Sequence, residues 1–311
     1  MRRRGRAARW GPPARATADL VRRTFAVCLR WRVTGLAAEA SFFTLLSLPG
    51  LALSLAAAAA AVGRAAGPDA TAELTRGVLE TSSRFVTPDV VRDVVAPTLD
   101  DALSTTRADL ISLGLLFALW SGSRAVHVFV DAITIMYGLG GLRGLALARL
   151  QSMLLHLVSL VVAVVGLPLL VLGPPLAERL LPDRLDGLTR VLWPVAVLVA
   201  TALVATLYHV ATPVRSPWRR DVPGAAAAVL VWLAASALLR VVVGESFARG
   251  ASVYGPLTTA IVVMGWLYLL AVAVLVGAAL NAAIDERWPL PARERARALR
   301  PGAAAPVGRA A

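Results

Sequence analysis

Six long runs of apolar residues, separated by short polar segments, dominate the pattern of this chain. Each run can cross the ~30 Å hydrocarbon layer of a membrane, which takes about 20 helical residues. Lipid offers backbone amides no hydrogen-bond partner and no alternating barrel pattern is present, so we expect helices. The sequence therefore predicts an all-α polytopic membrane protein with six transmembrane helices in a membrane domain over residues 36–284. The predicted spans are Leu36–Val62, Leu110–Tyr137, Ser152–Leu176, Val191–Ala211, Val222–Val243 and Pro256–Ile284.

The arginines of the connecting segments predict the orientation of these helices. Of the 32 basic residues, 21 lie before the first span, after the second, after the fourth and after the sixth, and 9 lie in the alternate segments. Positive residues are enriched in cytoplasmic loops. We therefore expect both termini in the cytoplasm.

The composition fits a membrane protein and excludes several other classes. Hydrophobic residues make up 58% of the chain and charged residues 16%, against about 45–50% and about 25% in soluble domains. The net charge of +13 would suit a nucleic-acid binder, but the arginines flank the apolar runs, so we expect no nucleic-acid partner. The single cysteine, Cys28, excludes a disulfide framework and a cysteine-based zinc site.

Three further segments accompany the membrane domain. Residues 1–35 form a basic N-terminal segment, in which residues 13–32 interleave apolar residues with arginines. This pattern has two interpretations: an interfacial helix on anionic lipid, or an ordinary positive flank of the first span. The outer loop 63–109 has apolar residues at helical spacing and predicts an amphipathic helical hairpin, which would cap the bundle or dock a partner. Residues 285–311, rich in Arg, Ala and Pro, predict a disordered cytoplasmic tail.

The second span carries charges that need an explanation. Arg124, His127 and Asp131 are three and four residues apart, so they share one helix face. Arg124 lies near the middle of the span, where an unpaired guanidinium costs at least ~2.5–3.5 kcal/mol. Three interpretations stay open: an ion pair with Asp131 or Glu39 that fixes helix packing, contact with an anion or lipid head group, and coupling to ion or proton movement.

Helix breakers in the first two spans extend this candidate site. Pro49 and Gly50 follow Ser47 near the middle of the first span and should kink or break the helix. Two interrupted helices with polar residues at similar depth are typical of transporter sites, although kinks also occur in membrane helices without a transport role. The candidate intramembrane site comprises Glu39, Ser47, Pro49, Ser121, Ser123, Arg124, His127 and Asp131.

Enzyme motifs are missing from the sequence. His127, His156 and His209 fall in different spans, and neither HExxH nor CxxC occurs. The run YGLGGLRG from Tyr137 follows a membrane helix instead of a strand, so we interpret it as a connecting turn and not as a nucleotide site. We therefore expect no catalytic residue, no metal and no cofactor.

Four stretches carry a resemblance to a known family. They are AAEASFFTLLSLPGLAL, LWSGSRAVHVFVDAITIMYG, PGAAAAVLVWLAAS and SVYGPLTTAIVVMGWLYLLAVAVLVGAALNA, from the first, second, fifth and sixth spans. In this order they resemble the YihY/BrkB family of bacterial inner-membrane proteins over residues 37–282. The resemblance implies six membrane helices with both ends cytoplasmic. Its motif residues here are Trp120, Tyr137, Tyr254, Gly255, Trp266, Tyr268 and Asn281.

The sequence departs from this family at two positions. Many relatives have an acidic residue where this chain has Ala279, and Asn where it has Thr134. Any mechanism that uses this carboxylate is in doubt, unless Glu39 or Asp131 substitutes.

The family carries two inherited labels, a serum-resistance virulence factor and a ribonuclease called BN. RNA hydrolysis usually needs clustered carboxylates or histidines that hold a metal, and the segment between the fourth and fifth spans offers only Asp221. We interpret the ribonuclease label as a misassignment.

We expect a non-enzymatic transporter, or a lipid- or anion-handling protein, of unknown substrate. The alternative is a structural protein whose outer loop binds an envelope partner. Expected partners are membrane lipids and an anionic head group or small anionic substrate, and a homo-oligomer is compatible with the sequence.

Overall fold

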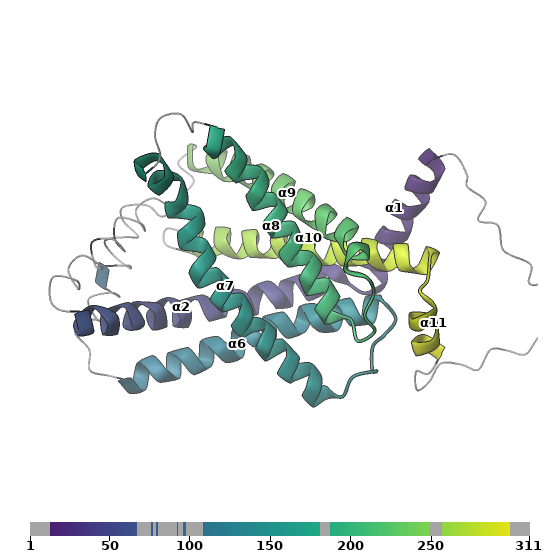
Figure 1. Cartoon of the computed structure of the whole chain (residues 1–311), viewed down its shortest axis with the longest axis horizontal. Helices are drawn as coiled ribbons and strands as arrows, with labels where there is room; N and C mark the ends of the chain where they lie inside the picture. Colours follow the sequence, from purple (N-terminus) through teal and green to yellow (C-terminus); the bar gives the residue numbers. More distant parts are fainter. Residues whose placement is uncertain are drawn as a thin grey trace, which may run out of the picture. The chain divides into compact units, whose positions relative to one another are not determined.

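A computed structural model of the chain describes residues 13–66, 108–180, 187–248 and 257–298, with residues 76, 79, 92, 96 and 97. Every regular element in these residues is a helix, as the all-α prediction required (Figure 1). The elements are α1 (Pro13–Arg30), α2 (Val33–Ala66), α6 (Ala108–Met136), α7 (Leu145–Leu180), α8 (Gly187–Ala211), the short 3₁₀ helix η3 (Trp218–Arg220), α9 (Val222–Ala248), α10 (Leu257–Arg287) and α11 (Pro291–Ala298).

The predicted spans coincide with helices of the structure. They fall on α2, α6, α7, α8, α9 and α10, with end points that differ by a few residues at most of the boundaries. By length and composition, the five helices from α6 to α10 can cross a membrane within the residues that the structure describes. A sixth span on α2 stays a prediction, because the side chains of residues 52–66 lie outside the description. The cytoplasmic location of the termini also stays a prediction.

Neither predicted interruption breaks its helix. α2 continues through Pro49, and α6 continues through residues 121–123. Pro49 removes one N–H, which leaves the carbonyl of Leu45 without its usual helical donor. Any further unpaired backbone group would be costly in lipid, so the chain keeps its remaining helical bonds. Pro49 therefore perturbs α2 locally without ending it.

The described residues divide into two compact units. Unit 1 comprises residues 1–41 and 126–311, and unit 2 comprises residues 42–125. The division falls inside α2 and α6, so each of these helices contributes to both units. Within unit 2, a Cβ on Gly50 would lie 2.5 Å from the carbonyl oxygen of Gly114 and 2.9 Å from the Cβ of Ala118. Small residues thus let α2 and α6 pack closely there.

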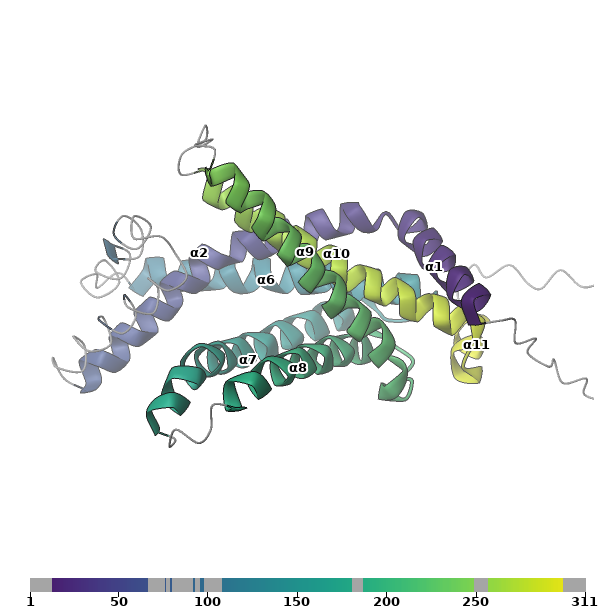
Figure 2. The same ribbon diagram turned by 90° about the horizontal axis from the view of Figure 1, so that it is seen from above.

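In unit 1, α10 packs along α9, and α1 and α8 pack against this pair (Figures 1 and 2). The closest approach is at Gly224 and Gly277, where a Cβ on either glycine would clash with the carbonyl oxygen of the other. A Cβ on Gly277 would also lie 2.5 Å from the hydroxyl of Tyr208 in α8. Small residues are the usual means of close helix packing in membranes. The surrounding buried core includes Ala205, Ala225, Ala271, Ala278, Ala279 and Ala282.

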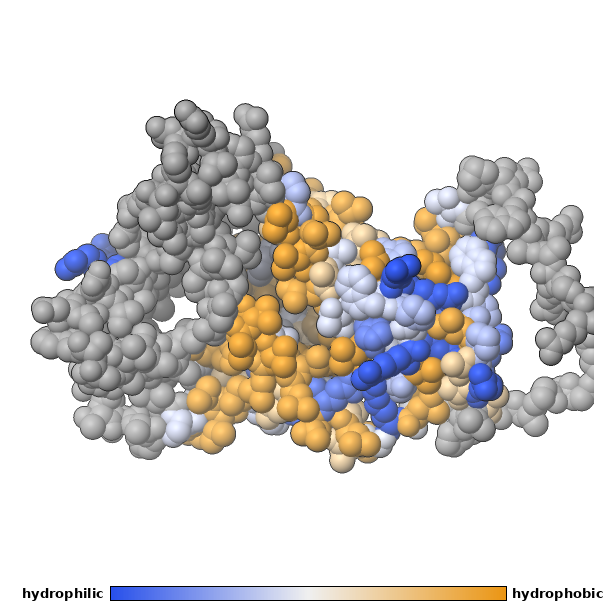
Figure 3. Space-filling model, in the orientation of Figure 1, coloured by the Kyte–Doolittle hydropathy of each residue, from blue (hydrophilic) through white to orange (hydrophobic). Residues whose placement is uncertain are grey.

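The outward faces of the helices in unit 1 are apolar. Leu154 of α7, Leu198 of α8 and Leu230 of α9 are each more than half exposed. Figure 3 shows apolar residues over much of the coloured surface, with polar residues gathered toward α11. Soluble proteins rarely expose contiguous apolar patches of this kind, so these faces are suited to contact with lipid.

The C-terminal segment differs from the predicted disordered tail. α10 continues to Arg287, and residues 291–298 form α11. Pro291 stands at the start of α11 and Glu294 in its first turn, both favourable positions. Arg293 is 1% exposed, which requires buried partners that a composition argument does not reveal. Residues 299–311, and nearly all of the outer loop after α2, lie outside the described residues.

The approach of α9 and α10 predicts opposite effects for two glycines of α10. Gly277→Ala should lower the melting temperature in detergent, because overpacking of a tight contact typically costs 1–3 kcal/mol. Gly265→Ala is the matched control, because nothing lies within 4 Å of a Cβ there. It should raise stability by about 0.5–1 kcal/mol through helix propensity. Equal shifts for the two variants would contradict the packing described.

Candidate functional site

Arg124 lies near the middle of the span on α6. Within the residues whose side chains the structure describes, this span covers Ser112–Met136, and the whole helix covers Ala108–Met136. The Arg124 side chain is half-buried, and the guanidinium carbon lies 5.6 Å from the centre of the Phe43 ring. Phe43 in turn meets Trp120 edge-on at 6.1 Å. All of these contacts lie within unit 2 and give Arg124 an aromatic neighbour at the middle of an apolar helix.

The three predicted serines of unit 2 are buried and bonded to their own helices. The hydroxyl of Ser47 donates to the carbonyl of Thr44 at 2.7 Å. Ser121 and Ser123 donate to the carbonyls of Phe117 and Trp120, each at 2.9 Å. Such bonds engage the hydroxyl protons and leave the oxygens as acceptors. Pro49 is exposed on α2.

The remaining predicted residues belong to unit 1. Glu39 is half-buried on α2, and Asp131 is exposed on α6. His127 is half-buried, and its Nδ1 lies 3.1 Å from the hydroxyl of Ser152 on α7. The structure therefore brings Arg124 together with Phe43, and His127 together with Ser152. An ion pair of Arg124 with Asp131 or Glu39 stays a prediction.

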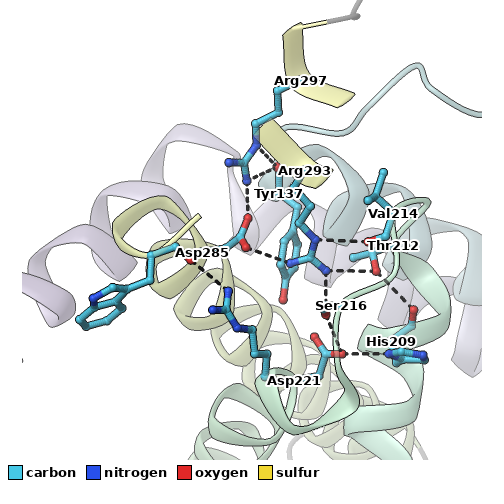
Figure 4. Close-up of polar contacts among 11 residues, drawn as sticks. Tyr137, His209, Thr212, Val214, Ser216, Asp221, Asp285, Arg293 and Arg297 are labelled. Atoms are coloured by element: carbon cyan, nitrogen blue, oxygen red, sulfur yellow. Dashed lines mark hydrogen bonds and ion pairs between the residues drawn. The ribbon is translucent and has the colours of Figure 1, made fainter. Parts of the chain in front are cut away.

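A second polar cluster, which we call the arginine network, lies at one end of unit 1 (Figure 4). It joins the end of α6, the segment from the end of α8 to the start of α9, the end of α10, and α11. Its residues are Tyr137, His209, Thr212, Val214, Ser216, Asp221, Asp285, Arg293 and Arg297.

The carboxylate of Asp285 is the centre of this network. Asp285 is 3% exposed and accepts bonds from Nη1 of Arg293 at 3.2 Å and Nη2 of Arg297 at 2.5 Å. Hydrogen bonds between ionised groups are shorter and stronger than neutral ones. One carboxylate therefore holds Arg293 and Arg297 of α11 against α10.

The two arginines also bind groups in the segments that follow α6 and α8. Arg293 donates from Nε to the carbonyl of Val214 at 3.2 Å and from Nη2 to the hydroxyl of Ser216 at 3.0 Å. Arg297 donates from Nε and Nη2 to the carbonyl of Tyr137, at 3.0 and 2.8 Å. This carbonyl lies at the C-terminal end of α6, where a cation is favourable. α11 thus caps α6 and holds the segment after α8.

The glycine-rich run after Tyr137 is a helix C-cap, which confirms its interpretation as a turn. Gly138 has φ 68°, a left-handed conformation that suits glycine. Its N–H bonds the carbonyl of Ile135 at 2.9 Å, and the N–H of Leu139 bonds that of Thr134 at 3.0 Å. These two bonds form a Schellman motif. A Cβ on Gly138 would lie 3.3 Å from Nε of Arg297, so glycine also leaves room for the arginine.

Asp221 is a second buried carboxylate of the network. Its Oδ2 lies 3.3 Å from Nδ1 of His209 and 3.4 Å from the hydroxyl of Ser216. Burial raises the pKa of Asp221, although His209 and the nearby Arg293 favour the ionised form. Burial likewise raises the pKa of Tyr137, whose ring lies 4.5 Å from the guanidinium of Arg293.

Two further side chains satisfy helix ends beside the network. Asn281 accepts from the N–H of Gly224 at 2.8 Å and donates to the carbonyl of Asp221 at 2.9 Å, which fixes the start of α9 on α10. Arg143 donates to the carbonyls of Ala211 and Thr212 at 3.0 and 2.9 Å, which caps α8. Burial lowers the pKa of Arg143, and the nearby charge of Arg215 adds to this effect.

The family-motif residues have different surroundings in the structure. Tyr137 and Asn281 are buried parts of unit 1, Tyr268 is half-buried, and Trp120 and Trp266 are exposed. Tyr254 and Gly255 lie outside the described residues. Sequence reasoning missed Asp285, Arg293 and Arg297 as interacting residues. Two signals could have indicated them: an acid at the end of an apolar run needs a partner, and PARERARA begins with Pro and carries an early Glu, as helices do.

Comparison with known proteins adds a family to this geometry. The family model described as "Virulence factor BrkB" matches residues 24–301. The chain belongs to the BrkB family. It is similar to YfkH of Bacillus subtilis (strain 168), whose name calls it ribonuclease-like, with 28% identity over 222 residues that cover 69% of this chain and 78% of YfkH. No solved structure matches. Family membership together with five apolar helices makes this BrkB-family chain a multi-pass membrane protein.

The arginine network predicts a large effect at Asp285 and a small one at its neighbour. Asp285→Leu should cost about 3–5 kcal/mol of stability, because Arg293 would stay buried without its carboxylate. Adding Arg293→Met should recover most of this loss. Glu286→Leu, at an exposed site, is the control and should change stability by no more than about 0.5 kcal/mol. Thermal melting in detergent measures all four proteins, and equal melting temperatures for Asp285→Leu and Glu286→Leu would rule out a stabilising network.

Proposed function

We propose that this BrkB-family protein binds and moves an anionic group within the membrane, either a lipid head group or a small free anion. The observation that supports this function is the guanidinium of Arg124 near the middle of the α6 span. Charged groups at this depth are costly and usually mark a substrate or ion pathway. Phe43 contacts this guanidinium, and Trp120 packs edge-on against Phe43.

Arginine is chemically suited to such a group. Its guanidinium is planar, more weakly hydrated than an ammonium and able to bind carboxylate or phosphate oxygens with two parallel N–H bonds. The contact with Phe43 uses the aromatic ring as partner and consumes no N–H donor. A guanidinium that contacts an aromatic ring in this way can still form two parallel bonds to an oxyanion. Phosphate esters of lipids and free oxyanions share this chemistry.

We propose as well that the protein is not a nuclease, although the name of YfkH refers to ribonucleases. The two buried carboxylates of the arginine network already have partners: Asp285 holds Arg293 and Arg297, and Asp221 contacts His209. A metal ion would have to displace these partners. In the part of the chain that the structure describes, no three His, Cys, Asp or Glu residues group as metal ligands.

Transport assays with liposomes test the role of Arg124. The purified chain should move a fluorescent phosphatidylglycerol across the bilayer, or release trapped inorganic phosphate, faster than empty liposomes do. Arg124→Leu should reduce the excess rate about tenfold or more, because hydrogen bonds to a charged group contribute about 1.5–3 kcal/mol. Arg124→Lys should also be impaired, since an ammonium cannot form the two-bond contact. The lipid assay and the phosphate assay distinguish the two sources of the anion.

Matched variants separate binding from folding in these assays. Arg240→Leu removes an exposed arginine at the end of the α9 span and should leave transport unchanged. Arg124→Leu combined with Asp131→Leu or Glu39→Leu should stay inactive even if thermal stability recovers. Recovery of both stability and transport in either double variant would assign Arg124 to an internal ion pair. Absence of transport in both assays would refute the proposal.

Purified protein should not cleave RNA above background in Mg²⁺, Mn²⁺ or Zn²⁺, because its buried carboxylates are engaged by cationic partners. The assay compares the chain with Asp221→Asn and with a preparation from cells that lack it. Metal-dependent cleavage that disappears in Asp221→Asn would contradict the non-enzymatic proposal.

A further inference from the structure

α1 packs against α10 through one face. Val27 is buried in the core of unit 1, and the carboxylate of Asp19 lies 3.3 Å from Nη1 of Arg287 at the end of α10. These contacts attach α1 to the same end of unit 1 that carries α11 (Figure 2). α1 is therefore a fixed element of unit 1 and not a free extension of the chain.

Another face of α1 presents an apolar stripe. Val21, Phe25 and Leu29 are 63%, 63% and 65% exposed, and their spacing of four residues places them on one side of the helix. No residue that the structure describes covers these three side chains to any large extent. A row of large apolar side chains at helical spacing needs an apolar environment.

Several exposed positions of α1 outside this stripe are arginines. Arg22 is exposed at the edge of the stripe, Arg23 and Arg30 are exposed on other sides of the helix, and Arg32 follows its end. The acid Asp19 accepts a bond from Arg23 at 2.8 Å, and this bond lowers its pKa and keeps it ionised. Asp19 is thereby engaged by arginines of its own helix and of α10. The surface around the stripe thus carries a clear positive excess.

Tryptophans near α1 indicate the level of the membrane boundary. Trp288 follows α10 and is 43% exposed, with the guanidinium of Arg287 5.0 Å from its ring. Trp218 of η3 is 42% exposed, and Arg220 of the same element donates to the carbonyl of Trp288 at 3.0 Å. Exposed tryptophan is enriched where membrane helices meet the head groups. Because Arg287 also contacts Asp19 of α1, α1 lies at the level of these tryptophans.

We propose that α1 is an interfacial helix that inserts Val21, Phe25 and Leu29 into the head-group boundary of an anionic lipid leaflet. The apolar stripe supplies the inserted face, and the exposed arginines bind the phosphates of the lipids. The basic N-terminal segment has two interpretations. If it were only a positive flank of the first span, the exposed stripe would have no apolar surroundings. The interfacial helix gives both the stripe and the arginines a partner. This inference is independent of any transport through Arg124.

The single cysteine makes a direct measurement possible. Cys28→Ser provides a background into which Phe25→Cys or Leu29→Cys is placed for a nitroxide label. Arg22→Cys is the matched control on the same helix, because the Arg22 side chain is 83% exposed beside the stripe. Each labelled protein is reconstituted in liposomes of phosphatidylcholine with or without phosphatidylglycerol. Accessibility to oxygen and to a water-soluble nickel complex then reports the depth of the label.

We expect labels at residues 25 and 29 to be accessible to oxygen and protected from nickel, and the label at residue 22 to show the reverse. Adding phosphatidylglycerol to the liposomes should move the labels at residues 25 and 29 deeper into the bilayer. Replacing Arg23, Arg30 and Arg32 by Gln should remove this lipid dependence without changing the melting temperature by more than a few degrees.

Two results would overturn the proposal. Equal access of nickel to residues 22 and 25 would place the stripe in water, as for an ordinary positive flank. Protection of residues 25 and 29 from both oxygen and nickel would show that protein covers the stripe, and in a purified sample this protein would be a second copy of the chain. Agreement between the two labelled positions excludes a local effect of either substitution.

Discussion

The buried carboxylate of Asp285 is the interaction on which one end of unit 1 depends. It compensates the charges of Arg293 and Arg297, and these arginines can then bind carbonyl groups at the end of α6 and after α8. A guanidinium at such a buried site would be strongly destabilising without the carboxylate. The docking of α11 therefore rests on one acid of α10, and the bonds from Arg297 to the carbonyl of Tyr137 after α6 rest on the docking of α11.

Close packing of small residues determines which polar groups can reach each other. The contact of Gly224 with Gly277 brings α9 near enough for Asn281 of α10 to bind both the carbonyl of Asp221 and the N–H of Gly224. Longer side chains at the glycines would separate the helices and leave these backbone groups unpaired. The fully buried Ala279 lies in the same core, so an acid at this position would need a partner here. Small side chains and polar contacts thus depend on one another.

The sequence predicted the helices well because hydrophobic length is a local property that the membrane itself dictates. It also pointed to Arg124, Tyr137 and Asn281, since a charge in an apolar run and a family motif are both visible in one dimension. It did not predict the arginine network. Arg297 binds Tyr137, 160 residues earlier in the chain, and no periodicity encodes a pairing over that distance. The Arg-rich composition of the C-terminal segment was misleading, because Arg293 and Arg297 bind the buried carboxylate of Asp285.

Depth in the membrane decides how each group of charges should be interpreted. The arginine network has more charges than the region around Arg124, but it lies at helix ends, where carbonyls, carboxylates and nearby water can compensate arginine. These contacts already account for Arg293 and Arg297 as structural residues. Arg124 stands near the middle of the α6 span, away from the helix ends that compensate Arg293 and Arg297. Charged groups at that depth usually mark a substrate or ion pathway, and for this reason we assign the proposed anion binding to Arg124 and not to the arginine network.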